Sequence, residues 1–215
     1  AGPACHAWRR RCLAAPADAG PARRQLVAQG KSNVGMLAGA MAGQLRSGDA
    51  AAVSAIGPAA CYATVKAAMI AERYLAEHLE GRSLGILPSR REFAGRDGGR
   101  DTNGMELLVR TLELPAELPA EPQVLAAANT NVGLMAGLMA NILKGGDMVT
   151  VGAMGPDAVS KALKATILTQ KYMADSLDSG GLALALVPRL NSFEQSGEER
   201  TRVLLGCVRV EGLAR

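Results

Sequence analysis

Aromatic side chains are scarce in this chain of 215 residues, which contains two phenylalanines, three tyrosines and one tryptophan. Any core therefore has to be built from Ala, Val, Leu, Ile and Met. Apolar residues still make up 48% of the sequence, which is ordinary for a folded protein and too high for a disordered one. The length allows one large domain or two small ones.

Histidine is also rare, and the four cysteines show no paired spacing. A reduced intracellular compartment fits this cysteine pattern better than a framework of disulfides. Cys5, His6 and Cys12 stand close together, but no second pair of ligands follows at the spacing of a zinc site. We therefore assign no metal, and we interpret His78, which has no nucleophile near it in the sequence, as a solvated residue.

A complete phosphate-binding loop is missing as well. The segment QGKSN at 29–33 is similar to the end of such a loop, but Gln25 stands where the motif needs a glycine. The chain offers no recognisable catalytic site, so we predict a protein that is not an enzyme and needs no cofactor.

Positive charge is concentrated at the start of the sequence. The formal net charge is +4, and residues 1–31 carry six basic side chains against Asp18 alone. Residues 1–23, the basic N-terminal arm, are rich in arginine and poor in acid, as transit peptides are. The absence of an initiating Met fits either a removed organellar targeting sequence or a truncated sequence. Because such arms are rarely ordered unless something holds them, we expect this one to run along RNA or along neighbouring proteins of a large assembly.

The sequence contains a long internal repeat. Residues 33–45 read NVGMLAGAMAGQL, and residues 131–143 read NVGLMAGLMANIL. Laid on 130–177 without a gap, 32–79 gives 20 identities in 48 positions, and after a two-residue shift Phe93 faces Phe193. The chain is therefore a duplicated domain of roughly 90 residues.

One uncharged stretch, 122–143, is long enough to span a bilayer. Polar residues interrupt it at Asn129, Thr130, Asn131 and Asn141, and the corresponding segment of the first copy carries a lysine. We expect a buried helix of a folded domain here and no transmembrane span.

Each copy shows the same succession of patterns. A short apolar run predicts a first strand, and Ser32-Asn33 or Thr130-Asn131 is suited to cap a helix that reaches about Leu45 or Leu143. A second strand follows, and Gly-Pro begins a longer helix. Third and fourth strands, separated by a polar loop, complete the order β-α-β-α-β-β. The predicted strands of the first copy are 24–28, 50–56, 83–87 and 105–114, and those of the second copy are 124–128, 148–154, 182–187 and 201–210. We predict an α+β fold with helices on one face of a small sheet.

These residues resemble a known family. The strings TVKAA (64–68), ALKAT (162–166) and above all SGEERTRVLLGCVRV (196–210) look like the stage V sporulation protein S family, which is related to the Alba superfamily of small dimeric nucleic-acid-binding proteins. In the first copy RDGGRDTNG (96–104) replaces the GEER turn. The resemblance implies two tandem Alba-like βαβαββ domains that pair as an intramolecular pseudo-dimer. We accordingly divide the chain into the arm 1–23, domain 1 at 24–114, a short stiff linker at 115–121 and domain 2 at 122–213.

Cationic side chains recur on the longer helix of each copy. Lys66 and Arg73 are seven positions apart, and Lys164 and Lys171 repeat this spacing, with Lys161 one turn earlier. Seven residues are almost two helical turns, so each pair shares a face. The face is suited to meet phosphate groups, but it also has the character of an ordinary solvated flank, because acidic residues stand close by at Glu72, Glu77 and Asp175. Both alternatives stay open at this point.

The loop 88–104 of the first copy is rich in arginine and glycine, with a net charge of +1. It occupies the hairpin position that Alba-like proteins use for nucleic-acid contacts, so the resemblance implies backbone contacts there. Only Phe93 could offer a ring to a base, so we expect little stacking. We expect the arm and this loop to make most phosphate contacts.

Two functional hypotheses follow. The first is a non-catalytic nucleic-acid-binding protein, with RNA favoured and DNA left open, that serves as a structural subunit of an organellar ribonucleoprotein such as a ribosome, in the mitochondrial matrix rather than in a plastid. The second is a protein-interaction scaffold in a large complex, which the near-neutral charge outside the arm favours. The predicted nucleic-acid-binding residues are Arg9, Arg10, Arg11, Arg23, Arg24, Lys31, Lys66, Arg73, Arg90, Arg91, Arg96, Arg100, Lys161, Lys164 and Lys171.

Overall fold

The computed structural model describes residues 25–48, 50–93, 102–114, 118–174 and 182–211. The first repeat contains β1 (Leu26–Ala28), α1 (Val34–Ser47), β2 (Ala50–Ala55), α2 (Pro58–Tyr74), α3 (Ala76–Leu79), β3 (Ser83–Phe93) and β4 (Thr102–Leu112). The second repeat contains β5 (Val124–Ala126), α4 (Val132–Gly145), β6 (Met148–Ala153), α5 (Gly155–Tyr172), β7 (Leu182–Gln195) and β8 (Glu198–Glu211). The predicted α+β fold of two tandem repeats is confirmed, with the short α3 as an addition.

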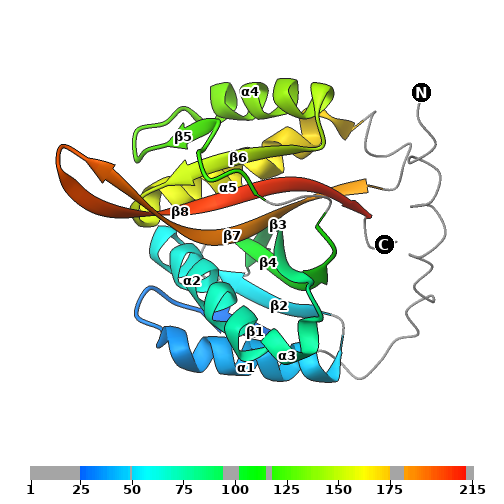
Figure 1. The fold of residues 1–215 in the computed structure, drawn as a ribbon. Coiled ribbons are helices and arrows are strands. Elements are labelled where there is room, and N and C mark those ends of the chain that lie inside the picture. The colour runs from blue at the N-terminus through cyan, green and yellow to red at the C-terminus, as the bar shows by residue number, and fades with distance from the viewer. Residues whose placement is uncertain (1–24, 49, 94–101, 115–117, 175–181, 212–215) are drawn as a thin grey trace, which may run out of the picture.

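The strands of both repeats join into one mixed sheet of eight strands. Their order is β1-β2-β4-β3-β7-β8-β6-β5, and β3 and β7 meet antiparallel at its centre (Figure 1). There Ile86 is the register partner of Leu186, and these two residues are equivalent in the repeat. A pseudo-twofold axis therefore passes between them, as in the self-complementary interface of a symmetric dimer.

The long helices form a layer over one face of this sheet. α1 packs on α2, α2 on α5, and α5 on α4, so the layer is continuous across the two repeats. One cluster of buried side chains lies between helices and sheet and draws on both repeats, including Met41 and Ile86 from the first and Met139 and Leu186 from the second. The two domains therefore share a core, which is the pseudo-dimer expected from the sequence.

The helices begin as the capping residues predict. The Oδ1 atom of Asn33 accepts a hydrogen bond from the backbone N–H of Met36 at 3.1 Å, and the Oδ1 atom of Asn131 accepts one from Leu134 at 3.1 Å. Each satisfies a backbone donor that the first turn leaves free. Gly57, at φ +85°, forms the turn into α2, a backbone conformation that suits glycine.

The hairpins are longer than the sequence predicts. The expected polar loop 88–104 is largely strand, because β3 continues to Phe93, whose register partner Thr102 opens β4. Residues 94–101 lie outside the described part of the chain. In the second repeat β7 and β8 pair as far as Gln195 and Glu198, and Figure 1 shows this hairpin projecting beyond the body.

The linker packs on the outer face of the second repeat, where the sequence predicts only a stiff connection. Leu118 lies over Gly206 and Pro122 over Gly152, positions where an added Cβ would meet these side chains. The Glu121 carboxylate also binds the Arg202 guanidinium at 2.7 Å. The absence of side chains at two sheet positions thus makes room for the segment 118–122.

The long uncharged stretch that includes α4 forms a short helix and not a span. α4 has 14 residues, and no helix within the described ranges is long and apolar enough to cross a membrane. Its buried side chains, among them Met135 and Met139, belong to the shared core.

The buried thiols carry a prediction for alkaline pH. Burial raises the pKa of Cys61 from 9.0 to about 11, against the opposing effect of the nearby Lys164 ammonium, and burial raises the pKa of Cys207 to about 12. Unfolded thiols ionise near their ordinary value, so the unfolded chain loses these protons first as the pH rises. We expect the free energy of unfolding to be unaffected by these thiols below pH 9.0 and to fall as the pH rises through the folded pKa values.

The measurement is urea unfolding at a series of pH values between 8 and 11, for the wild type and for Cys207→Ala. The variant should show a shallower alkaline fall than the wild type. Equal slopes for the two proteins would show that the Cys207 thiol does not contribute.

Candidate nucleic-acid interface

The predicted arginines of the arm and of the hairpin tip lie outside the described residues. They are Arg9, Arg10, Arg11, Arg23, Arg24, Arg96 and Arg100. Their proposed contacts with nucleic acid therefore stay predictions from the sequence. Lys31 is described, and it is exposed in the turn between β1 and α1.

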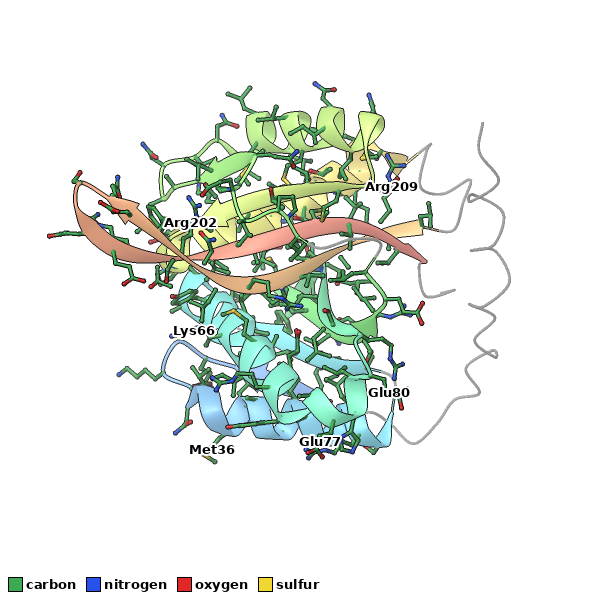
Figure 2. The ribbon with its side chains drawn as sticks, in the orientation of Figure 1. Met36, Lys66, Glu77, Glu80, Arg202 and Arg209 are labelled. Atoms are coloured by element: carbon green, nitrogen blue, oxygen red, sulfur yellow. The ribbon has the colours of Figure 1, made fainter. Side chains whose placement is uncertain are left out.

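The helical cations lie in the middle of the helix layer, on two helices that pack side by side. Lys66 and Arg73 are on α2, and Lys161, Lys164 and Lys171 are on α5. Arg73, Lys164 and Lys171 are exposed, whereas Lys66 and Lys161 are half-buried. Figure 2 shows Lys66 toward the end of the molecule from which the β7–β8 hairpin projects. The repeat therefore presents cations from both copies on neighbouring helices.

None of these five helical cations shares an ion pair with another residue in the described ranges. The ion pairs there are Arg91–Glu106, Arg189–Glu72, Arg200–Glu198 and Arg202–Glu121. Glu72, which the sequence places beside Arg73, is bound instead by Arg189 from the second repeat. Asp175 is not among the described residues. Among the described residues, no carboxylate thus neutralises these charges on α2 and α5.

Lys66 differs from its repeat partner Lys164 in one respect. Its ammonium group lies 4.5 Å from the centre of the Tyr62 ring, an attractive cation–π contact. At the position of Tyr62 the second repeat has Ser160, so no ring stands four positions before Lys164. The two lysines are equivalent in sequence and unequal in surroundings.

Arg90 and Arg91 lie in the paired strand β3, and their side chains alternate between the two faces of the hairpin. Arg91 binds the carboxylate of Glu106 at 2.7 Å, so its charge is partly neutralised. Arg90 donates to the Oδ1 atom of Asn103 from both Nε, at 3.3 Å, and Nη2, at 2.9 Å. This neutral partner fixes the direction of the Arg90 guanidinium without cancelling its charge.

An arginine that the sequence reasoning did not single out connects the two repeats. Arg189 of β7 binds Glu72 of α2 at 2.9 Å through Nη1 and donates from Nη2 to the Ser83 hydroxyl of β3 at 2.7 Å. Glu72 also accepts from the backbone N–H of Leu84 at 3.2 Å. The equivalents of Arg189 and Glu72 are Ser89 and Gln170, so this connection exists on one side of the pseudo-twofold axis only.

The Arg189–Glu72 pair should be measurable in a double-mutant cycle. Arg189→Met, Glu72→Gln and the double variant should give a coupling free energy of about 1–2 kcal/mol in urea unfolding, because the pair is only partly exposed and hydrogen-bonded on both sides. The same cycle for the exposed pair Arg200–Glu198 serves as the control, with a coupling below about 0.5 kcal/mol. Equal coupling in the two cycles would contradict a connecting role for Arg189.

The described residues include few groups of side chains that could serve as metal ligands. Within the described ranges there is no group of three or more His, Cys, Asp or Glu residues that could hold a metal ion. The chemistry that the α2 and α5 surface can perform is electrostatic attraction and hydrogen-bond donation to anions.

Comparison with known proteins identifies the family of this chain. A search of curated proteins finds no match. The model of the family described as "Stage V sporulation protein S (SpoVS)" matches the chain twice, over residues 24–110 and over residues 123–210. Each match covers one of the two repeats that meet at the centre of the sheet. The chain therefore belongs to the stage V sporulation protein S family and carries two tandem copies of its domain.

Proposed function

We propose that this chain binds nucleic acid through phosphate contacts from the helices α2 and α5. The observation that carries the proposal is the set of exposed cations Arg73, Lys164 and Lys171, which share no ion pair in the described part of the chain. Lysine and arginine at a protein surface displace the counterions of nucleic acid, which favours binding of any sequence. The arm and the loop 88–104, from which the sequence predicts most phosphate contacts, add charge of the same sign, but the arm lies outside the described residues and the proposal is therefore argued from the helices.

RNA is the ligand we favour, in the role of a non-catalytic subunit of an organellar ribonucleoprotein. The support for this finer statement is the composition of the arm, which is rich in arginine and poor in acid, as are basic arms that bind nucleic acid and segments that direct a chain to an organelle. The two-fold arrangement of the helices also offers two cationic segments from one chain, as a dimer of single domains would.

The binding experiment compares single-stranded and duplex forms of RNA and DNA, of equal length, by fluorescence anisotropy with the full chain. We expect micromolar or tighter binding at 50 mM salt and clear weakening at 200 mM, because phosphate contacts release counterions. RNA should bind more tightly than DNA of the same form. Absence of binding to all four ligands at 50 mM salt would refute the proposal.

A scaffold role is the second candidate, and one observation favours it. Large apolar side chains are exposed on the outer helices, with Met36 of α1 at 75% and Leu134 of α4 at 76% of full exposure. Figure 2 shows Met36 pointing away from the body. The two helices lie at opposite ends of the helix layer, so each end presents an exposed apolar side chain that is suited to contact another protein. A chain that binds no nucleic acid but assembles with other proteins would support this alternative.

A further inference from the structure

A cavity opens where the two repeats meet, between α5 of the second repeat and the sheet of the first. Its volume is about 440 Å³, within the range of small-molecule sites. The first repeat contributes the ends of β2, β3 and β4, and the second contributes the start of α4 and one face of α5. A single domain of this family could not form the cavity, because each repeat supplies only one wall.

The walls combine apolar surface with cations. Met105, Ile167 and Leu168 supply apolar surface, and Arg90, Lys164 and Lys171 supply positive charge. Lys164 and Lys171 are about 10 Å apart along the helix axis, at 1.5 Å per residue. Arg90 approaches from the opposite wall, held by Asn103, which also lines the cavity. Cations on two walls can meet one anionic group together.

The two halves of the molecule differ at this place. Where the cavity has Ser160, the first repeat has Tyr62, and where it has Arg90, the second repeat has Leu190. The Tyr62 ring fills space beside Lys66, and Leu190 brings no charge. The small hydroxyl of Ser160 and the guanidinium of Arg90 thus give one half an open, cationic wall that the equivalent positions of the other half do not reproduce.

We propose that this cavity binds a nucleoside monophosphate unit, with the phosphate between Arg90, Lys164 and Lys171 and the nucleoside against Met105, Ile167 and Leu168. The apolar wall is suited to the apolar face of a nucleobase, and the three cations are suited to a phosphate group. The unit is either a free nucleotide or the terminal nucleotide of a bound strand. Only the second of these ligands, the terminal nucleotide of a bound strand, depends on the proposed nucleic-acid binding.

The test is calorimetric titration of the full chain with AMP, adenosine and inorganic phosphate. We expect AMP to bind, with adenosine and phosphate each at least ten-fold weaker, because each fills only part of the cavity. Arg90→Leu, which introduces the residue found at this position in the other repeat, and Lys164→Met should each weaken AMP binding roughly ten-fold. Lys144→Met, on α4 and outside the cavity, is the matched control and should leave AMP binding unchanged.

A second variant separates the cavity from the surrounding charge. Ser160→Tyr introduces the residue that the first repeat has at this position, so it should fill the cavity while all three cations remain. We expect AMP affinity to fall at least ten-fold, with an unchanged circular dichroism spectrum. If the variant also binds a 5′-phosphorylated RNA oligonucleotide more weakly, the natural ligand is the terminal nucleotide of a strand. If only the affinity for AMP falls, the natural ligand is a free nucleotide.

Two results would overturn the proposal. One is the absence of AMP binding at millimolar concentration, and the other is wild-type AMP affinity in a folded Ser160→Tyr protein. Either result would leave RNA binding by α2 and α5 untouched. Conversely, AMP binding by a chain that binds no RNA would uphold the cavity and refute the proposed function.

Discussion

Replacing Arg73, Lys164 and Lys171 together by methionine should weaken RNA binding roughly a hundred-fold at 100 mM salt, because each charged contact with a phosphate contributes about 1 kcal/mol or more. The three side chains are exposed and share no ion pair within the described residues. Their removal therefore leaves no buried partner charge unpaired. The loss should be similar on every RNA sequence, because phosphate contacts position a strand and do not distinguish bases.

The matched control removes the same charge from other surfaces. Arg46, Arg82 and Lys144 are exposed and lie outside α2 and α5. Their triple methionine variant should retain RNA affinity within about three-fold, which corresponds to a weak, delocalised electrostatic effect. If both variants lose affinity equally, net charge and not the helix surface determines binding.

Ile86→Ala should lower the free energy of unfolding by about 2–5 kcal/mol, the usual cost of a cavity in a packed core. Ile86 is fully buried at the centre of the sheet, where it pairs with Leu186 and belongs to the core that both repeats share. The loss should appear in one cooperative transition, because the cluster has no boundary between the repeats. Leu190→Ala, at a position with 66% exposure, should change stability by less than about 0.5 kcal/mol.

Hydrogen exchange followed by mass spectrometry provides the measurement for Ile86→Ala. Amides of β2 and β6, in different repeats, should lose protection by the same free energy. Loss of protection confined to the first repeat would show that the domains unfold independently and would contradict a shared core.

Local signals explain why much of the fold could be predicted from the sequence. Asn33 and Asn131 cap helices through their own side chains, and Pro58 stands at the first residue of α2, so each start is determined within a few residues. Because the sequence is a repeat, each of these local patterns occurs twice. Helix order and the pairing of two domains followed from these patterns together with the family resemblance.

The hairpins and the contacts between repeats could not be predicted in this way. Beyond Pro88 the strand β3 carries Ser89, Arg90 and Arg91, which are exposed, so the hydrophobic alternation that indicates a strand disappears. The Arg189–Glu72 pair joins residues 117 positions apart, and nothing in either local sequence indicates the partner. Long-range pairs of this kind depend on how the two repeats meet in the shared sheet.

The candidate site was predicted in part. The spacing of Lys164 and Lys171 indicated a common helix face. The sequence did not show that Glu72, which stands beside Arg73, would bind Arg189 of the second repeat. The cavity did leave a signal in the sequence. Comparing the repeats position by position gives Ser160 against Tyr62 and Arg90 against Leu190, and such differences mark the places where two copies have diverged.

The most direct test of phosphate binding by α2 and α5 is the salt dependence of RNA affinity between 50 and 200 mM salt. It should be measured for the wild type, for the Arg73, Lys164 and Lys171 variant, and for the Arg46, Arg82 and Lys144 control. Each lost phosphate contact reduces the log–log slope by about 0.9 on a duplex and about 0.7 on a single strand. We predict a slope reduced by about 2 to 3 in the helix variant and a wild-type slope in the control. A helix variant with the wild-type slope would contradict the account and place the phosphate contacts elsewhere in the chain.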